Sequence, residues 1–94
     1  MIYVLIEREI AEDLESTYEE AARRLLANAY HTTGFVDGHT YNELDNSRRR
    51  FTLSKWRSVF HWQQWYNSDE RREQMRQLAP LLAHEERITF LERT

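Results

Sequence analysis

Apolar and polar positions recur with a different period in each part of the chain, and the period predicts the elements. Residues 2–10 are rich in branched and aromatic side chains and contain no glycine or proline, which predicts a β-strand. From Leu14 the apolar positions follow the period of a helix. They form one stripe, which consists of Leu14, Tyr18, Ala21, Ala22, Leu25 and Ala29. Overlapping capping boxes at Ser16 and Thr17, or Asp13 as the cap, place the start of this helix nearby.

The middle of the chain predicts a hairpin. Gly34 opens a second strand over 34–45, and a turn at 45–47 leads into a third strand over 48–56. Four polar positions share one face of the second strand: Asp37, His39, Tyr41 and Glu43. They form either a network that can relay a proton or the charged face of an edge strand, where charge discourages unwanted pairing.

The last third of the chain is predicted to be helical before it returns to a strand. Residues 58–67 have helical spacing, and Ser68 caps a further helix that Pro80 ends or kinks. The apolar face of the first of these segments consists of Val59, Trp62 and Tyr66, with Trp65 at its border. Residues 86–93 alternate loosely and predict a fourth strand.

This order of elements predicts an α+β fold of the ferredoxin-like type, a βαββαβ sandwich with a four-stranded antiparallel sheet and its helices on one face. The first, third and fourth strands nevertheless carry apolar residues on both faces, as Ile2 against Tyr3 and Leu53 against Trp56 illustrate. Each such side chain left in water forgoes ~1.5 to 3 kcal/mol. We therefore expect two copies to pack sheet against sheet, as a homodimer.

Length and composition narrow the class of protein. The 94 residues predict a single domain over 1–94, and the absence of cysteine excludes disulfides, thiolate metal sites and cysteine nucleophiles. A chain without cysteine suits a reducing compartment, so the cytoplasm is the expected location. The net charge of -3 comes from interspersed acids and bases, so nucleic acid is not an expected partner. No apolar run approaches the ~20 residues of a membrane span, so no membrane partner is expected.

No metal site is expected either. The four histidines, at positions 31, 39, 61 and 84, are scattered, and none has a companion at the spacing of metal ligands. Solvent-facing histidines are the simpler interpretation.

One pattern around the tryptophans resembles a known family. The third strand ends in Leu-Ser-Lys-Trp, and S-x-x-x-W-x-x-W-x-x-S-x-x-R follows. Its residues are Trp56, Ser58, Trp62, Trp65, Ser68 and Arg71. Together with the order of elements and a Gly-Phe pair at the second strand, this pattern is similar to the antibiotic biosynthesis monooxygenase family of dimeric α+β barrels. The resemblance covers nearly the whole chain and implies a ligand pocket between sheet and helices, with Trp56 on its wall.

The resemblance implies a cofactor-independent monooxygenase that acts on a small aromatic or polyketide-like substrate. The substrate phenol or enol would lose a proton and pass an electron to dioxygen, without metal or flavin. Such a site must be dry and must offer donors to the developing oxyanion. The candidate catalytic residues are Trp56, Tyr66 and Asn42, and the candidate substrate-binding residues are Trp62, Phe60, Gln63, Arg57 and Glu7.

A second branch of the family binds and degrades haem and resembles this chain less. That branch has asparagine on the first strand, tryptophan at the end of the third strand and a histidine ligand about ten residues later. Trp56 fits, but Glu7 stands where asparagine would be, and Tyr66 stands where histidine would be. Tyrosinate can bind ferric haem, and His61 lies nearby, so haem stays an alternative that the sequence disfavours.

Simpler interpretations stand beside these. Trp56, Trp62 and Trp65 can instead be core residues, which is the commoner meaning of such a stripe at helical spacing. Only an open cavity would tie the tryptophans to function. Glu7 is either a partly buried carboxylate able to act as a base, or a surface group paired with an arginine. A non-catalytic, dimeric ligand-binding or stress-response module is the remaining alternative function.

Overall fold

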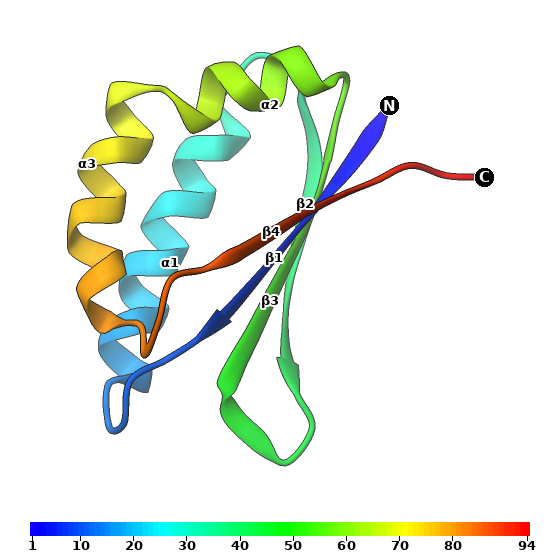
Figure 1. Cartoon of the computed structure of the whole chain (residues 1–94). Coiled ribbons are helices and arrows are strands. Elements are labelled where there is room, and N and C mark those ends of the chain that lie inside the picture. The colour runs from blue at the N-terminus through cyan, green and yellow to red at the C-terminus, as the bar shows by residue number, and fades with distance from the viewer.

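A twisted four-stranded sheet with helices on one of its faces makes up the structure (Figure 1). The computed structural model describes residues 1–94. In chain order the elements are β1 (Ile2–Glu9), α1 (Glu15–Tyr30), β2 (Phe35–Glu43), β3 (Asn46–Trp56), α2 (Val59–Tyr66), α3 (Asp69–Leu78) and β4 (Arg87–Leu91). None of the helices combines the length and the apolar character that crossing a bilayer requires.

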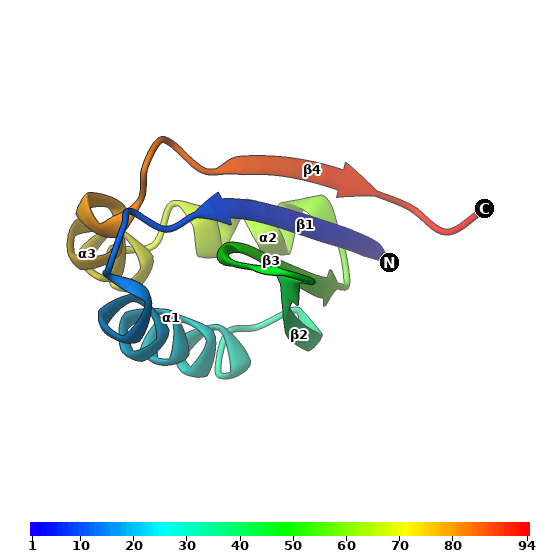
Figure 2. The same ribbon diagram turned by 90° about the horizontal axis from the view of Figure 1, so that it is seen from below.

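The sheet has the order β2-β3-β1-β4, and every neighbouring pair is antiparallel. This confirms the predicted ferredoxin-like arrangement. Side chains of paired residues lie on the same side of a sheet. The face toward the helices, the inner face, therefore carries Val4 and Ile6 of β1 beside Ser54 and Thr52 of β3. Figure 1 and Figure 2 together show the helices on this side of the sheet.

The core lies between the inner face and the helices. It contains eleven buried apolar residues, among them Val4, Ile6, Tyr18, Leu25 and Trp56. The predicted stripe of α1 is the buried side of that helix, with Tyr18, Ala21, Leu25 and Ala29 inside. Aromatic rings continue the core toward α2, because Trp56 meets Trp62 edge to face at 5.6 Å.

The start of α1 differs from the prediction. Leu14 is the N-cap residue, and no side chain makes a capping hydrogen bond there. Asp13 has a left-handed backbone with φ of 66°, which belongs to the turn before the helix, so it does not cap. Ser16 lies one residue inside the helix and Thr17 two, so the predicted caps were wrong.

The helical region after β3 consists of two short helices in succession. Ser58 caps α2 by accepting a hydrogen bond from the backbone N–H of His61, and Ser68 caps α3 as predicted, by accepting from Arg71. The buried side of α2 is formed by Trp62 and Trp65. The predicted apolar face was therefore misplaced, since Val59 and Tyr66 are partly exposed.

Smaller differences concern the ends of elements. The turn of the hairpin falls between Glu43 and Asn46, so Leu44 and Asp45 form it, and β3 begins earlier than predicted. A φ of 65° at Asp45 supplies the left-handed residue that a tight turn needs. Helix α3 ends at Leu78 and passes into a 3₁₀ turn that contains Pro80, as expected where proline cannot continue a helix.

The face of the sheet away from the helices, the open face, is partly apolar and carries no covering element. Its central positions are Leu5 and Leu53, which are paired across β1 and β3. The flanking positions on this face are Tyr3, Phe51, Tyr41 and Leu91. Tyr41 and Leu91 are exposed. This agrees with the predicted excess of apolar side chains on both faces of the sheet.

Position 34 requires a glycine, both because of its backbone conformation and because a neighbouring side chain leaves no room for a Cβ. Its φ is 91°, and a Cβ added to it would overlap Cβ and Cγ of His61 at the start of α2. We expect Gly34→Ala to lower the free energy of unfolding by about 1 to 3 kcal/mol, as measured in urea. Gly38→Ala is the matched control, because Gly38 has no positive φ and a Cβ there would meet only the ends of two side chains, Phe35 at 3.0 Å and Leu26 at 3.4 Å. Equal losses in both variants would contradict the strain at Gly34.

Candidate functional site

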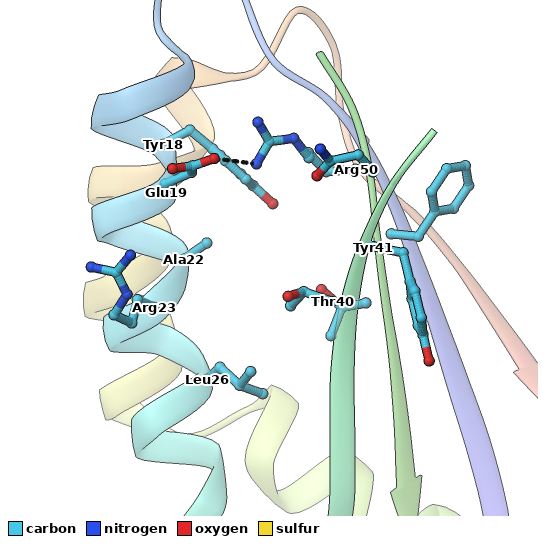
Figure 3. Close-up of a pocket in the computed structure, with 11 residues that line it drawn as sticks. Tyr18, Glu19, Ala22, Arg23, Leu26, Thr40, Tyr41 and Arg50 are labelled. Atoms are coloured by element: carbon cyan, nitrogen blue, oxygen red, sulfur yellow. Dashed lines mark hydrogen bonds and ion pairs between the residues drawn. The ribbon is translucent and has the colours of Figure 1, made fainter. Parts of the chain in front are cut away.

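A cavity of about 340 Å³ lies between α1 and the β2–β3 part of the sheet (Figure 3). We call it the outer cavity. Helix α1 contributes Tyr18, Glu19, Ala22, Arg23 and Leu26, and the inner face of the strands contributes Thr40, Asn42, Arg50 and Thr52. Figure 3 shows Tyr18 reaching from α1 toward the strands, whereas the ring of Tyr41 stands on the far side of them.

A smaller cavity of about 40 Å³, the inner cavity, adjoins it toward the core. The two share four lining residues: Ala22, Leu26, Thr40 and Thr52. Trp56 and Trp65 are the large rings on its wall, and Arg8 is the one charged residue there. About 10 to 15 Å³ of such space holds one water molecule, so the inner cavity can take a hydroxyl-sized group. Its lining is mostly apolar.

Trp56 is fully buried and serves as a wall of the inner cavity. Its indole N–H donates to Ser54 Oγ at 3.0 Å, and that hydroxyl lies 3.5 Å from the carbonyl oxygen of Val4. Because an indole has a single donor, Trp56 has none left for a ligand. The ring packs edge to face on Phe35 at 5.2 Å, so its orientation is fixed from two sides.

Behind the inner cavity lies a cluster of buried charges, Arg8, Arg71 and Glu86, which we call the buried ion cluster. Glu86 joins the two arginines, because its Oε1 accepts from Arg8 Nε at 2.9 Å and its Oε2 accepts from Arg71 Nη2 at 2.7 Å. Arg8 is 4% exposed, and the Glu86 side chain is 9% exposed. Tyr18 extends the cluster, since its hydroxyl accepts from Arg8 Nη1 at 3.2 Å.

The charges of this cluster hold one another ionised. Burial disfavours the charged form of Glu86, but Arg8 and Arg71 outweigh it and keep the pKa of Glu86 below its ordinary value. Burial also opposes the charge of Arg8, yet Tyr18 and Glu86 raise the pKa of that guanidinium. Two guanidinium groups and one carboxylate leave the buried ion cluster with a net positive charge of one.

Charges at the mouth of the outer cavity are partly neutralised. Arg50 Nη1 pairs with Glu19 Oε1 at 3.0 Å, which Figure 3 shows as a dashed line, and Arg50 Nε donates to the carbonyl oxygen of Ser47 at 2.7 Å. The Arg50 guanidinium also lies over the ring of Tyr18, 5.8 Å from its centre. Arg23 adds a second positive charge at the rim.

The structure brings only some of the predicted site residues to the two cavities. Asn42 lines the outer cavity and Trp56 lines the inner one, while Trp62 lies buried against Trp56. Four candidates lie away from both cavities and are exposed: Tyr66, Phe60, Gln63 and Arg57. The ring of Tyr66 lies beneath the Arg71 guanidinium, 4.6 Å from its carbon. The roles predicted for these residues stay predictions.

Glu7 lies on the open face, opposite the cavities. Its carboxylate approaches Arg49 at 3.6 Å and Arg87 at 3.8 Å, which agrees with the surface ion pair that the sequence allowed. Glu7 and Trp56 therefore lie on opposite faces of the sheet, and Tyr66 points to neither cavity. Nearby His61 binds Ser58 Oγ through Nδ1 at 2.7 Å. The positions that the haem-binding branch uses do not converge here, so these residues do not fit haem.

The polar face of β2 contains one close pair. His39 Nε2 lies 3.0 Å from Asp37 Oδ2, and both side chains are exposed on the edge strand. Neither the outer nor the inner cavity is lined by this pair, which favours the interpretation as an edge-strand face. No group of three or more histidine, aspartate or glutamate side chains is arranged to hold a metal ion.

Sequence reasoning missed the polar groups that border the cavities. Tyr18 was assigned to the core stripe of α1, and Arg8 received no role. A signal for Arg8 was present, because it occupies the same strand face as Val4 and Ile6, where a charge must find buried partners. No sequence signal identified Glu86 as that partner, since the two lie 78 residues apart.

Comparisons with known proteins agree with this fold. A family model described as "Antibiotic biosynthesis monooxygenase" matches residues 1–77. A conserved protein from Methanosarcina mazei Go1 superposes with a TM-score of 0.91 at 20% identity, covering 99% of this chain and 92% of that one. A putative antibiotic biosynthesis monooxygenase from Nitrosomonas europaea superposes with a TM-score of 0.90 at 11% identity, covering 99% and 98%.

A third solved structure carries a description of activity. SnoaB, described as a cofactor-independent oxygenase from Streptomyces nogalater, superposes with a TM-score of 0.83 at 15% identity, covering 99% of this chain and 95% of its own. At these identities the likeness shows the fold alone. No curated protein sequence matches the chain significantly.

Proposed function

The chain belongs to the antibiotic biosynthesis monooxygenase family, and we propose that it is a cofactor-independent monooxygenase that oxidises a small aromatic or polyketide-like substrate. The observation that carries this proposal is the pair of adjoining cavities between α1 and the sheet, walled at the inner end by Trp56. Ligand sites are typically concave and largely apolar, with a few placed polar groups. The inner cavity has this apolar character, and the outer cavity adds polar and charged side chains. The oxygenase description of the structurally similar SnoaB supports the same proposal.

The proposed reaction needs little from the protein beyond shape and charge. The substrate phenol or enol loses a proton, and its anion passes one electron to dioxygen. Recombination forms a carbon–oxygen bond, and loss of water leaves a quinone, so one oxygen atom enters the product and the other enters water. The chain's part is to exclude water around the reacting carbon and to stabilise negative charge on the substrate oxygen. Trp56 forms the wall of this space, and Asn42 stands at its mouth.

We propose that the protein acts as a homodimer in the cytoplasm, with two open faces packed together as in a dimeric α+β barrel. Leu5, Leu53, Tyr3 and Phe51 would then lose their remaining contact with water, which favours association by the hydrophobic effect. Ion pairs such as Glu7 with Arg49 lie on the same face and would set the register of the two copies.

Blocking the outer cavity tests the proposed activity. Ala22 lines both cavities from α1, so Ala22→Phe places a ring in the space that a substrate would need. With an anthrone as substrate, we expect oxygen uptake and anthraquinone formation by the unaltered protein, and at least a tenfold lower rate (roughly) in Ala22→Phe. An oxygen electrode measures the consumption of dioxygen, and the absorbance of the quinone measures the formation of the product.

Ala27→Phe is the matched control, because Ala27 is exposed on the same helix and lines neither cavity. Melting curves confirm that both variants fold. Absence of uptake by the unaltered protein with anthrones and hydroquinones would contradict the activity and favour the non-catalytic binding module. Equal uptake by both alanine variants would show that oxidation occurs outside the cavities.

A further inference from the structure

We propose that Tyr18 and Arg8 together bind the anionic oxygen of a phenol or enol ligand where the outer and inner cavities meet. This rests on the proposed function, which places such a ligand in the cavities, and it adds the two groups that select the ligand's ionised form. Neither Tyr18 nor Arg8 belongs to the residues that the sequence pattern or the family resemblance singled out as a site.

The hydroxyl of Tyr18 has a proton that no protein atom accepts. A guanidinium group contains only donors, so in the 3.2 Å contact with Arg8 Nη1 the tyrosine oxygen must be the acceptor. Tyr18 makes no other side-chain hydrogen bond and is 4% exposed, and its side chain lines the outer cavity. Its O–H is therefore free to donate to a ligand, and the bond from Arg8 polarises it into a stronger donor.

Arg8 also has an unused donor. Its Nε binds Glu86 and its Nη1 binds Tyr18, but its Nη2 has no hydrogen-bond partner. Every fully buried side-chain nitrogen and oxygen has a partner, so Nη2 must keep contact with accessible space. Arg8 borders the inner cavity, which has room for a hydroxyl-sized group. The geometry thus supplies two donors, one from α1 and one from β1, at adjoining cavities.

The local charge favours an anion over a neutral ligand. The buried ion cluster carries a net positive charge that is shielded little from the inner cavity, because its members are almost completely buried. At the outer cavity the negative charge of Glu19 is paired with Arg50, and Arg23 adds a positive charge. Asn42, Thr40 and Thr52 are uncharged, so no unpaired carboxylate lines either cavity to oppose an anion.

Binding of para-nitrophenol tests this inference without any turnover. Its anion absorbs visible light and its neutral form does not, so a titration across pH reports which form is bound. We expect the unaltered protein to prefer the phenolate and to lower the apparent pKa of the bound probe by about one unit or more. Tyr18→Phe should weaken phenolate binding by about tenfold to a hundredfold, the loss typical of a hydrogen bond to a charged group, with a smaller change for the neutral phenol.

Tyr30→Phe is the matched control. Tyr30 lies on the same helix, and its hydroxyl donates to the carbonyl oxygen of Gly38 at 3.1 Å, away from both cavities. It should leave the affinity for the phenolate unchanged. Arg8→Lys keeps the positive charge but loses the forked donors, and should weaken phenolate binding as well. If either variant folds poorly, the unaltered protein alone can be tested with nitrobenzene, which has the same ring without the hydroxyl. Nitrobenzene should bind more weakly than para-nitrophenolate.

The outcomes separate the inference from the proposed function. Equal affinity of the unaltered protein for para-nitrophenolate and nitrobenzene, or unchanged phenolate binding in folded Tyr18→Phe, overturns the inference. If oxygen uptake is unchanged in Tyr18→Phe, the proposed oxygenase activity stands, but the role of Tyr18 in it does not. Preferential phenolate binding in a protein that takes up no oxygen with anthrones supports the inference and overturns the proposed activity.

Discussion

Glu86→Gln should lower the free energy of unfolding by about 3 to 5 kcal/mol, the loss typical of removing one partner from a buried ion pair. Glu86 is the only carboxylate that contacts Arg8 and Arg71, which are almost fully buried. Without its charge, two guanidinium groups would face each other in a space with little water. Urea unfolding followed by tryptophan fluorescence measures the change, since all three tryptophans lie in or beside the core.

Two further variants distinguish lost charge compensation from a general effect of replacing a glutamate. Glu73→Gln removes an exposed partner of Arg76 on α3 and should change stability by no more than about 0.5 kcal/mol. The triple variant Arg8→Met, Arg71→Met and Glu86→Leu removes all three charges together. It should be much more stable than Glu86→Gln, because apolar replacement of a complete buried ion network is often neutral. A triple variant as unstable as Glu86→Gln would contradict this account.

The contribution of the Glu86 charge to stability should also depend on pH. The folded protein holds the pKa of Glu86 below its ordinary value of 4.5. The unfolded chain therefore binds a proton at Glu86 before the folded chain does as the pH falls. The contribution of Glu86 is fully present above about that ordinary value and is lost as the pH falls through the folded pKa. The stability difference between the unaltered protein and Glu86→Gln should accordingly shrink below about pH 4.5.

The sequence predicted the order of the elements because each has its own period. The run of branched and aromatic residues in β1 and the stripe of α1 are local patterns, and pairing in an antiparallel sheet follows from the order of the elements. The cap of α1 could not be predicted in the same way. Several residues near its start are capable caps, but none of them caps the helix. The left-handed backbone at Asp13 belongs to the turn from β1, and Leu14 becomes the N-cap residue.

The site was predicted less completely than the fold, because the partner of each polar side chain depends on how the elements pack and on which way each side chain points. Trp56 lies on the wall of the inner cavity, yet its donor is used by Ser54, two residues earlier on the same strand face. Tyr66 follows Trp62 by one helical turn, but α2 turns it outward to Arg71. Arg8 and Tyr18 meet only because β1 and α1 pack face to face, which a pattern within one element does not show.

Dimer formation is the second large expected effect, and Leu53→Glu tests it. Leu53 pairs with Leu5 at the centre of the open face, and in a two-fold dimer each substitution would occur twice. Each buried leucine contributes ~1.5 to 3 kcal/mol, so losing both should raise the dimer dissociation constant at least about a hundredfold. Sedimentation at micromolar concentration should find a dimer of the unaltered protein and a monomer of Leu53→Glu.

Leu44→Glu controls for adding a carboxylate to the same hairpin, because Leu44 is 90% exposed at its turn and should not be needed for association. A monomer of Leu53→Glu should keep its fold, since this side chain already borders water on the open face while the core lies on the other side of β3. Its lower stability at equal concentration would then measure the linkage between association and folding. A folded unaltered protein that sediments as a monomer at every concentration would remove the homodimer from the proposed function, because the open face would then be stable in water.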